Sequence, residues 1–520
     1  MPAMTTLPAT AARGMRAETL LAGISLGVAW DLLFATEGLF DSGMGGLSLW
    51  VALTGALSLW LNRHASAAWR GVLAWWSAMA FAATLPLLLR ATEALIPISF
   101  LVLLGCAAAV LLQADGTRLR DATAAGLLRS VLRLPAQILR NVWAAPAQWR
   151  RESREIDAAA LASTRSARRE RLGAALRGAL LAAPLLFVFV GLFSSADAGF
   201  ERFAQRAGDL ISQDVRWHVL VSLIMGLIST GLLSCATPRG SSAAPRQSSR
   251  TLGDIELAIL LGSLCLLFLA FVTVQLPTLF AGREALAEVV GLSVADYARR
   301  GFFQLLVAAL LSLVLLLGLS ALQTSPRLFR PLALLLVSCV LVILTSAAQR
   351  LLLYVESFGL TLDRVLAIAC MVWLALLLPS FAATVLRGRP QGFGAGLLLS
   401  GIGIVLLLGM ANPAARVAEI NLARATAKPA TLDVDYLLAL GADTMPALLS
   451  HLDAMAAPQR CQVARTLLPL ARQSVTDWRR WNASTARARR LVAEREAEIL
   501  EIRESAACRL PLMGPAFRRP

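Results

Sequence analysis

Stretches of roughly 20 consecutive apolar residues recur along this chain, and they constrain its fold more than any other feature. The run LLVAALLSLVLLLGL at 305–319 is typical. A helix of about 20 residues spans the ~30 Å hydrocarbon core of a bilayer. Only a helix satisfies its backbone hydrogen bonds within one segment, and a closed barrel would show shorter, alternating stretches. The expected fold class is all-α, a polytopic transmembrane helix bundle with a C-terminal soluble helical domain.

Eleven spans are expected, four before a long polar insert and seven after it. They cover residues 20–39, 43–61, 71–89, 94–112, 174–193, 219–236, 258–280, 302–322, 331–348, 366–386 and 393–411. This pattern divides the chain into a four-span membrane segment (1–113), a basic loop (114–172), a seven-span membrane core (173–411) and a C-terminal helical domain (412–520). Small residues four apart, as at Gly23 and Gly27 or Gly392 and Gly396, predict close helix packing.

The composition supports lipid as the solvent of most of the chain. Of the 520 residues, 57% are apolar and 16% charged, and the mean hydropathy is +0.66. The net charge of +16 is carried almost entirely by arginine between the apolar stretches. Arginine there contacts anionic lipid and fixes orientation, so membrane lipids are the expected partners and nucleic acid is not.

The distribution of arginine predicts which side each loop faces. With a cytoplasmic N-terminus, the inner segments carry 23 arginines and the outer segments nine. The long insert supplies most of this margin, since the other segments alone give 11 against nine. An odd number of spans then places the tail, 412–520, on the outer side of the membrane.

The insert also contains an amphipathic segment at 127–143. Its apolar residues recur at near-helical spacing, with Arg129, Arg133 and Arg140 between them. Such a helix lies on an anionic inner leaflet, or packs against the bundle, and the sequence leaves both open.

The cysteines divide into two groups. Five lie inside expected spans, where a thiol behaves as a small apolar group: Cys106, Cys235, Cys265, Cys339 and Cys370. Cys461 and Cys508 are the only pair in the tail. An oxidising compartment would allow a disulfide between them, although two cysteines do not require one.

Local catalytic signatures give no support for an enzyme. The sequence contains no GxxxxGKS/T phosphate loop, no HExxH and no CxxC. The three histidines, His64, His218 and His451, are scattered, and each is expected at an interface or surface. We therefore expect no catalytic residue, no metal site and no cofactor.

Asp31 is the clearest ionisable residue within a span, in the sequence VAWDLLF. A charge in hydrocarbon costs a few kcal/mol unless it has a partner or faces a cavity. Asp31 is expected either to pair with a basic residue such as Arg177 or to line a polar path. Arg177 lies near the start of its own span, and an alternative is that it extends to the inner interface.

A second concentration of polar residues lies at the expected outer ends of the spans. It consists of Tyr297, Arg299, Arg300, Arg350, Tyr354, Glu356 and Arg364. Arginines beside tyrosines are suited to an anionic lipid head group or another phosphate- or carboxylate-bearing ligand. The alternative is internal pairing, Arg350 with Glu356 and Arg364 with Asp363.

Four segments carry a resemblance to a known family. They are GLSVADYARRGFFQLLVAAL (291–310), RLLLYVESFGLTLDRV (350–365), NPAARVAEINLAR (412–424) and DVDYLLALGAD (433–443). Together they resemble the bacterial membrane family catalogued as domain of unknown function 4173. The resemblance implies a multi-pass envelope protein and brings no activity.

Three hypotheses for function follow. The first is a non-enzymatic envelope protein that senses or scaffolds, with the tail as an outer-side domain for a protein partner. The second is a transporter or lipid-handling protein that binds an anionic ligand at the arginine and tyrosine cluster. The third is an intramembrane transferase. The halves of the chain show no internal repeat of the kind found in many transporters, which favours the first.

Overall fold

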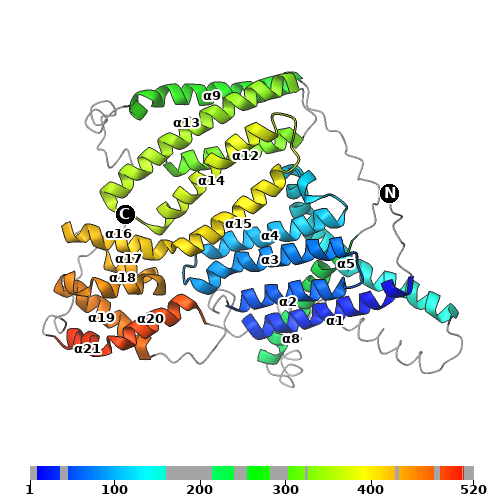
Figure 1. Cartoon of the computed structure of the whole chain (residues 1–520), viewed down its shortest axis with the longest axis horizontal. Coiled ribbons are helices and arrows are strands. Elements are labelled where there is room, and N and C mark those ends of the chain that lie inside the picture. The colour runs from blue at the N-terminus through cyan, green and yellow to red at the C-terminus, as the bar shows by residue number, and fades with distance from the viewer. Residues whose placement is uncertain are drawn as a thin grey trace, which may run out of the picture. The chain divides into compact units, whose positions relative to one another are not determined.

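The computed structural model describes residues 9–34, 45–159, 213–238, 254–280, 302–321, 326–427, 432–472, 481–505 and 508. Every regular element in these ranges is a helix, and they contain no strand (Figure 1). The all-α fold class is therefore confirmed.

Seven of the described helices are long and apolar enough to cross a membrane. They are α3 (Ala67–Leu89), α4 (Leu95–Ala114), α8 (Gln213–Cys235), α12 (Phe302–Ala321), α13 (Pro326–Phe358), α14 (Leu362–Thr384) and α15 (Phe393–Ala411). Each corresponds to one of the spans expected from the sequence. The chain is a membrane protein.

The other four expected spans are not among these seven. The helix α2 (Gly45–Leu61) and the apolar part of α9 (Asp254–Phe280) are shorter apolar helices. The first expected span, 20–39, overlaps α1 (Ala9–Phe34). This helix begins 11 residues before the expected span, and its sequence includes charged residues. The expected span at 174–193 lies outside the described residues. The number of eleven spans stays a prediction, as does the four-part division of the chain.

The chain divides into two compact units, which are described separately. The first comprises residues 1–81, 104–116 and 129–242. Within it α1 lies against α8 (Figure 1). Gly23 of α1 faces Thr230, and a Cβ on Gly27 would collide with the backbone of Ser222 and Gly226. The close packing predicted for Gly23 and Gly27 is thus present, because glycine lets the two backbones touch.

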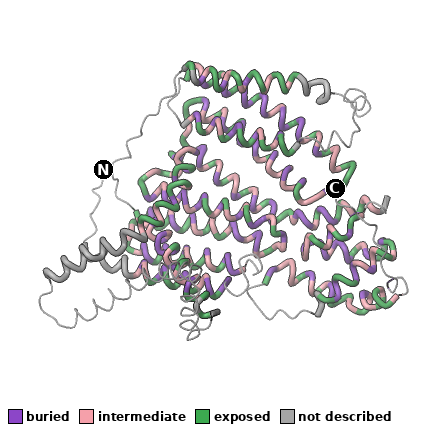
Figure 2. The backbone as a smooth tube through the Cα atoms, turned by 180° about the vertical axis from the view of Figure 1, so that it is seen from behind, coloured by how far each residue is buried: buried purple, intermediate pink, exposed green. Residues whose placement is uncertain are grey.

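The helix α5 (Ala124–Ala159) corresponds to the amphipathic segment and extends beyond it. In the first unit, Leu134 packs with Leu111 and Cys235, and Ile138 lies against Gly231 of α8. On other faces of α5, leucines and arginines are exposed: Leu132, Leu139, Arg129, Arg133 and Arg140. One face of α5 therefore packs against neighbouring helices, and its other faces present an apolar, basic surface. Figure 2 shows that buried and exposed residues alternate along the other described helices as well.

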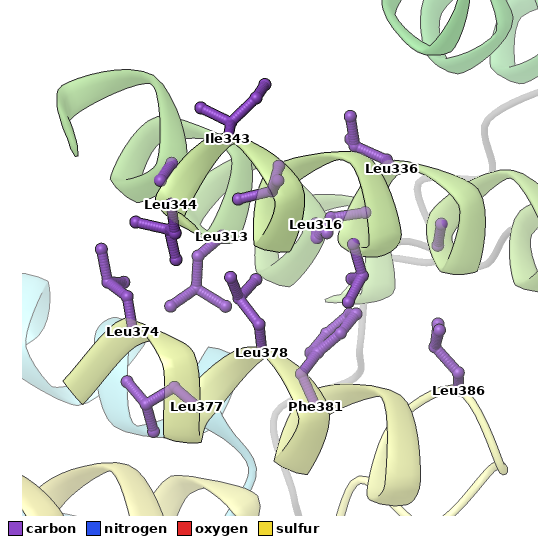
Figure 3. Close-up of a cluster of buried hydrophobic side chains, with 14 of the residues drawn as sticks. Leu313, Leu316, Leu336, Ile343, Leu344, Leu374, Leu377, Leu378, Phe381 and Leu386 are labelled. Carbon is purple, nitrogen blue, oxygen red and sulfur yellow. The ribbon is translucent and has the colours of Figure 1, made fainter. Parts of the chain in front are cut away.

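The second unit comprises residues 82–103, 117–128 and 243–520. Its largest core lies between α12, α13 and α14, where leucines of the three helices interdigitate around Phe381 (Figure 3). On the other side of α13 lies α9, whose Leu257, Leu261 and Cys265 join the same core. These helices pack mainly through apolar side chains, and α12 and α13 also bury the small polar residues Ser312 and Ser346.

The tail helices form a second core in the same unit. They are α16 (Pro413–Ala427), α17 (Val434–Ala439), α18 (Met445–Ser450), α19 (Ala457–Arg472), α20 (Ala483–Glu494) and α21 (Glu496–Glu504), with 3₁₀ turns at Ala442–Thr444 and Leu452–Ala454. The core includes Val417, Leu448 and Leu467, and Leu360 from the turn between α13 and α14 joins it. Tail and membrane helices therefore share apolar contacts at this turn.

Segments expected on the same side of the membrane pair with each other inside each unit. In the first unit, Arg63 donates two hydrogen bonds of 2.9 Å to Glu18, which lower the pKa of that carboxyl. In the second unit, the Ala122 carbonyl accepts from the Gly392 backbone N–H at 3.1 Å. These contacts agree with the alternation of helices expected from the sequence.

The close helix packing predicted for Gly392 and Gly396 is not observed. Gly392 precedes α15 at φ +84°, and a Cβ on Gly396 would meet no atom within 4 Å.

The contact between α1 and α8 yields a first prediction. Gly27→Ala places a methyl group against the α8 backbone and should lower the free energy of unfolding by about 1–3 kcal/mol. Gly71→Ala, on α3, meets no atom within 4 Å and should have no such effect. Unfolding midpoints of the purified protein in detergent distinguish the two variants. Equal midpoints would show that α1 and α8 are not in close contact.

Candidate functional site

The structure places only part of the predicted cluster. Tyr297, Arg299 and Arg300 lie outside the described residues, and so does Arg177. Of the remaining members, Arg350, Tyr354 and Glu356 lie in the last turns of α13, and Arg364 lies in the first turn of α14, after the turn that joins the two helices.

Arg364 is used to hold this turn together. Its side chain is 8% exposed and donates a hydrogen bond to the Gly359 carbonyl. The guanidinium lies 3.9 Å from the centre of the Tyr354 ring, and Tyr354 in turn contacts Phe358 edge to face. Stacking of arginine on tyrosine therefore stabilises the chain itself at this turn.

Three side chains of the tail complete the turn, and we call them the turn anchor: Asn421, Arg424 and Tyr436. Asn421 accepts from the Leu360 backbone N–H at 2.9 Å and donates to the Leu360 carbonyl at 2.7 Å. Arg424 donates to the carbonyls of Val355 at 3.0 Å and Glu356 at 2.9 Å. The Val355 carbonyl also accepts from the Gly359 backbone N–H at 2.8 Å, so Arg424 adds a second bond there and caps the last turn of α13.

Tyr436 closes the anchor from the first helix of the tail after α16. Its hydroxyl accepts from the Leu362 backbone N–H at 2.8 Å. Burial is the main cause that raises the pKa of Tyr436, and the nearby Asp363 also raises it. The position of the phenol is itself fixed by Asp433, whose carboxylate caps α17 by accepting from the Tyr436 N–H at 2.9 Å.

Gly359 is required where it stands. Its φ is +85°, and a Cβ there would lie 2.6 Å from the Asn421 side-chain oxygen and 2.8 Å from Arg424. Glycine is the residue that adopts this conformation without cost and leaves room for both side chains.

A second contact, which we call the loop anchor, joins the tail to the loop between α3 and α4. Asp443 is 1% exposed and accepts from the Ala91 N–H at 2.8 Å, the Thr92 hydroxyl at 2.9 Å and the Ser484 hydroxyl at 2.6 Å. A buried carboxylate is tolerated when several donors surround it. The burial of the Asp443 carboxylate therefore depends on donors from this loop, and the loop backbone in turn depends on Asp443 as an acceptor.

Asn482 and Arg90 extend the loop anchor. Asn482 donates to the carbonyls of Leu87 at 3.0 Å and Arg90 at 2.6 Å, while its own oxygen caps α20. Arg90 donates to the Gly409 carbonyl at 2.6 Å, at the end of α15. Side chains and backbone from α3, α15 and α20 thus meet in one hydrogen-bonded network.

Asp31 has a partner that the sequence did not suggest. Its carboxylate lies 3.1 Å from Nδ1 of His218, at the start of α8. Both residues line a cavity of about 270 Å³ between α1 and α8, together with Ile24, Val28, Val219, Ser222, Leu223, Gly226, Leu227 and Thr230. His218, whose side chain is 36% exposed, was expected at an interface or surface, and that expectation is not contradicted; the sequence did not suggest its pairing with Asp31.

The segment GISLG at 23–27 has the GxSxG spacing of a hydrolase nucleophile. That motif works because a sharp turn between a strand and a helix exposes the serine. Here Ser25 lies within α1, and its hydroxyl donates to the Leu21 carbonyl at 2.9 Å. The segment is a helix-packing motif, and it is not a nucleophile site.

Cys461 and Cys508 are joined by a disulfide in the structure, with Cα atoms 5.4 Å apart. The bond connects α19 to the residues that follow α21, where Arg465 also donates to the Cys508 carbonyl. Among the residues that the structure describes, no group of three or more His, Cys, Asp or Glu side chains is arranged to hold a metal ion.

The raised pKa of Tyr436 gives a prediction with a defined sign. The folded state holds the phenolic proton above its ordinary pKa near 10, so the stabilisation is complete below that pH and decreases above it. Tyr436→Phe should remove this alkaline component and cost about 1 kcal/mol at neutral pH through the lost acceptor. Unfolding of the two proteins between neutral pH and about pH 11 tests this. If the stabilities of the wild-type and Tyr436→Phe proteins changed with pH in the same way, the pKa of Tyr436 would not be raised in the folded state.

The comparisons with known proteins agree with a membrane protein and refine the family. The family described as domain of unknown function (DUF4153) matches residues 72–451, which is more than half of the chain. No curated protein and no solved structure matches this chain. The resemblance to domain of unknown function 4173 is not confirmed. Both anchors fall largely within the matched residues, and the chain belongs to the DUF4153 family.

Proposed function

We propose that this protein is a non-enzymatic scaffold or sensor of the bacterial inner membrane, whose tail helices form an outer-side domain that binds a protein partner. The observation that carries the proposal is the pair of anchors. They connect the tail to two separate connections between membrane helices, the α13–α14 turn and the α3–α4 loop. A partner bound to the tail would therefore act on both.

The anchors are suited to transmit such an event because they are buried, polar and specific. Asp443 and Asn421 each bond backbone groups of the connection that they contact. Leaving one such buried group without its partner costs about 1–3 kcal/mol. Satisfied buried networks fix one arrangement, so a displacement of the tail must move the connections or break these bonds.

The disulfide supports an outer position for the tail. Disulfides persist in oxidising compartments such as the periplasm and are rare in the bacterial cytoplasm. Cys461 and Cys508 belong to the tail, and their bond closes the α19 to α21 region. With the N-terminus inside, as the arginine distribution predicts, the tail lies in that compartment.

The second hypothesis, an anionic ligand at the arginine and tyrosine cluster, is less well supported. Arg364 already donates to the Gly359 carbonyl and stacks on Tyr354. Of the other arginines, Arg299 and Arg300 lie outside the described residues. The exposed leucines and arginines of α5 instead support anionic lipids as partners at the membrane surface.

A crosslinking experiment in cells tests the scaffold. A photoreactive amino acid at Trp481, which is 46% exposed, should trap a protein partner. Asp443→Asn removes the charge and one of the two acceptor oxygens that Ala91, Thr92 and Ser484 share, so the adduct should decrease at least several-fold. Asp453→Asn, at an exposed acid of the same domain, is the matched control and should leave it unchanged. Adducts with lipid alone, or equal yields in both variants, would contradict the proposal.

The sidedness is tested with two exposed alanines. A membrane-impermeant maleimide should label Ala493→Cys, on α20, in intact spheroplasts. Ala67→Cys, at the start of α3, should react only after lysis, because the predicted topology places it inside. The reverse pattern would place the tail in the cytoplasm.

A further inference from the structure

The cavity between α1 and α8 differs from both anchors, because the side chains of Asp31 and His218 have only each other as hydrogen-bond partners among the described residues. Asp31 is 8% exposed, and its Oδ1 atom contacts Nδ1 of His218. These two are the only ionisable side chains among the described residues that line the cavity. We propose that this cavity binds the primary ammonium group of an amphiphile, with ethanolamine lipids as its source in the membrane.

The hydrogen-bond chemistry of the pair defines the ligand. A carboxylate only accepts hydrogen bonds, so the tautomer that fits this contact has an N–H at Nδ1 of His218, which donates to Asp31. In a neutral imidazole the other nitrogen, Nε2, is then an acceptor. The pair presents two kinds of acceptor, the second carboxylate oxygen and Nε2. A primary ammonium has three N–H donors and matches them, whereas a quaternary ammonium has none.

Charge points to the same class of ligand. A carboxylate favours a cation, and no arginine or lysine is among the described residues that line the cavity. An anionic head group would meet the negative charge of Asp31 without compensation. A charge-assisted hydrogen bond contributes roughly 1.5–3 kcal/mol, so the loss of the carboxylate should weaken binding by about 10-fold or more.

The rest of the cavity indicates that the amine is carried on an apolar chain. Most of the lining is apolar, and Ile24, Val28 and Val219 are also exposed on the surface of the helices. A volume of about 270 Å³ is just below the usual range of ligand pockets. It holds a head group or part of one chain, with the remainder in the surrounding lipid. Gly27 and Gly226 keep the two helices at the distance that forms this cavity.

The proposal goes beyond the scaffold function and does not depend on the tail. Asp31 precedes the residues matched by the family, whereas His218 lies within them. Family membership therefore predicts neither the pair nor its ligand.

Native mass spectrometry of the full-length protein, stripped of lipid in detergent, tests the proposal. Lysophosphatidylethanolamine should bind one per chain, at least about 10-fold more tightly than lysophosphatidylcholine, which has the same chain and a quaternary head group. Lysophosphatidylglycerol should bind as weakly. Equal binding of the first two would overturn the proposal.

Variants assign binding to the pair. Asp31→Asn and His218→Phe should each abolish the preference for ethanolamine over choline. Asp121→Asn, at an exposed carboxylate outside the cavity, should retain it. If Asp31→Asn does not fold, His218→Phe together with the wild-type comparison still decides the outcome. Preference retained in a folded variant of the pair would locate binding elsewhere and overturn the assignment.

A final arm separates the two sources of a primary amine. Free ethanolamine, added in about 10-fold excess over the lysolipid, should not displace it, because the apolar lining contributes to binding. Complete displacement would show that the site takes a water-soluble amine and would overturn the lipid source.

Discussion

The backbone groups at the connections between membrane helices impose the constraint on which the rest of this structure depends. Each helix ends with carbonyls that have no partner within it, and burial without a partner is costly. At the α13–α14 turn, Arg424 donates to carbonyls of α13 and Asn421 donates to the Leu360 carbonyl. At the α3–α4 loop, Asn482 donates to the Leu87 carbonyl, and Asp443 accepts from the Ala91 N–H. The membrane helices are therefore completed by the tail.

This constraint separates two kinds of buried polar residue. Asp443 accepts from three donors of the chain itself, so its carboxylate serves to hold the fold together. Asp31 has His218 and an adjoining cavity, and the pair retains acceptor capacity. Burial alone would rank both as candidate sites. The partners of each carboxylate are what distinguish a structural residue from a residue able to bind a ligand.

The sequence predicted the helices well because hydrophobic length is a local property. The spans in α13 and α15 required only the apolar residues themselves. It did not predict Asn421 or Asn482, since an asparagine becomes informative only when its partner, here Leu360 or Leu87, is known to lie beside it. His218 was missed for the same reason. Pairing across 187 positions of sequence leaves no local pattern.

The residues matched by the family show how the anchors divide along the chain. The match at 72–451 contains most of α3 and all of α13, α16 and α17, together with the whole turn anchor and Asp443. Asn482 and the disulfide lie after it. The turn anchor is therefore built entirely from family sequence, while Asn482, at the start of α20, adds further hydrogen bonds to a loop that Asp443 already contacts. The helices α20 and α21 lie outside the family match. A partner that binds this protein and not other members of the family would therefore contact the tail at these two helices.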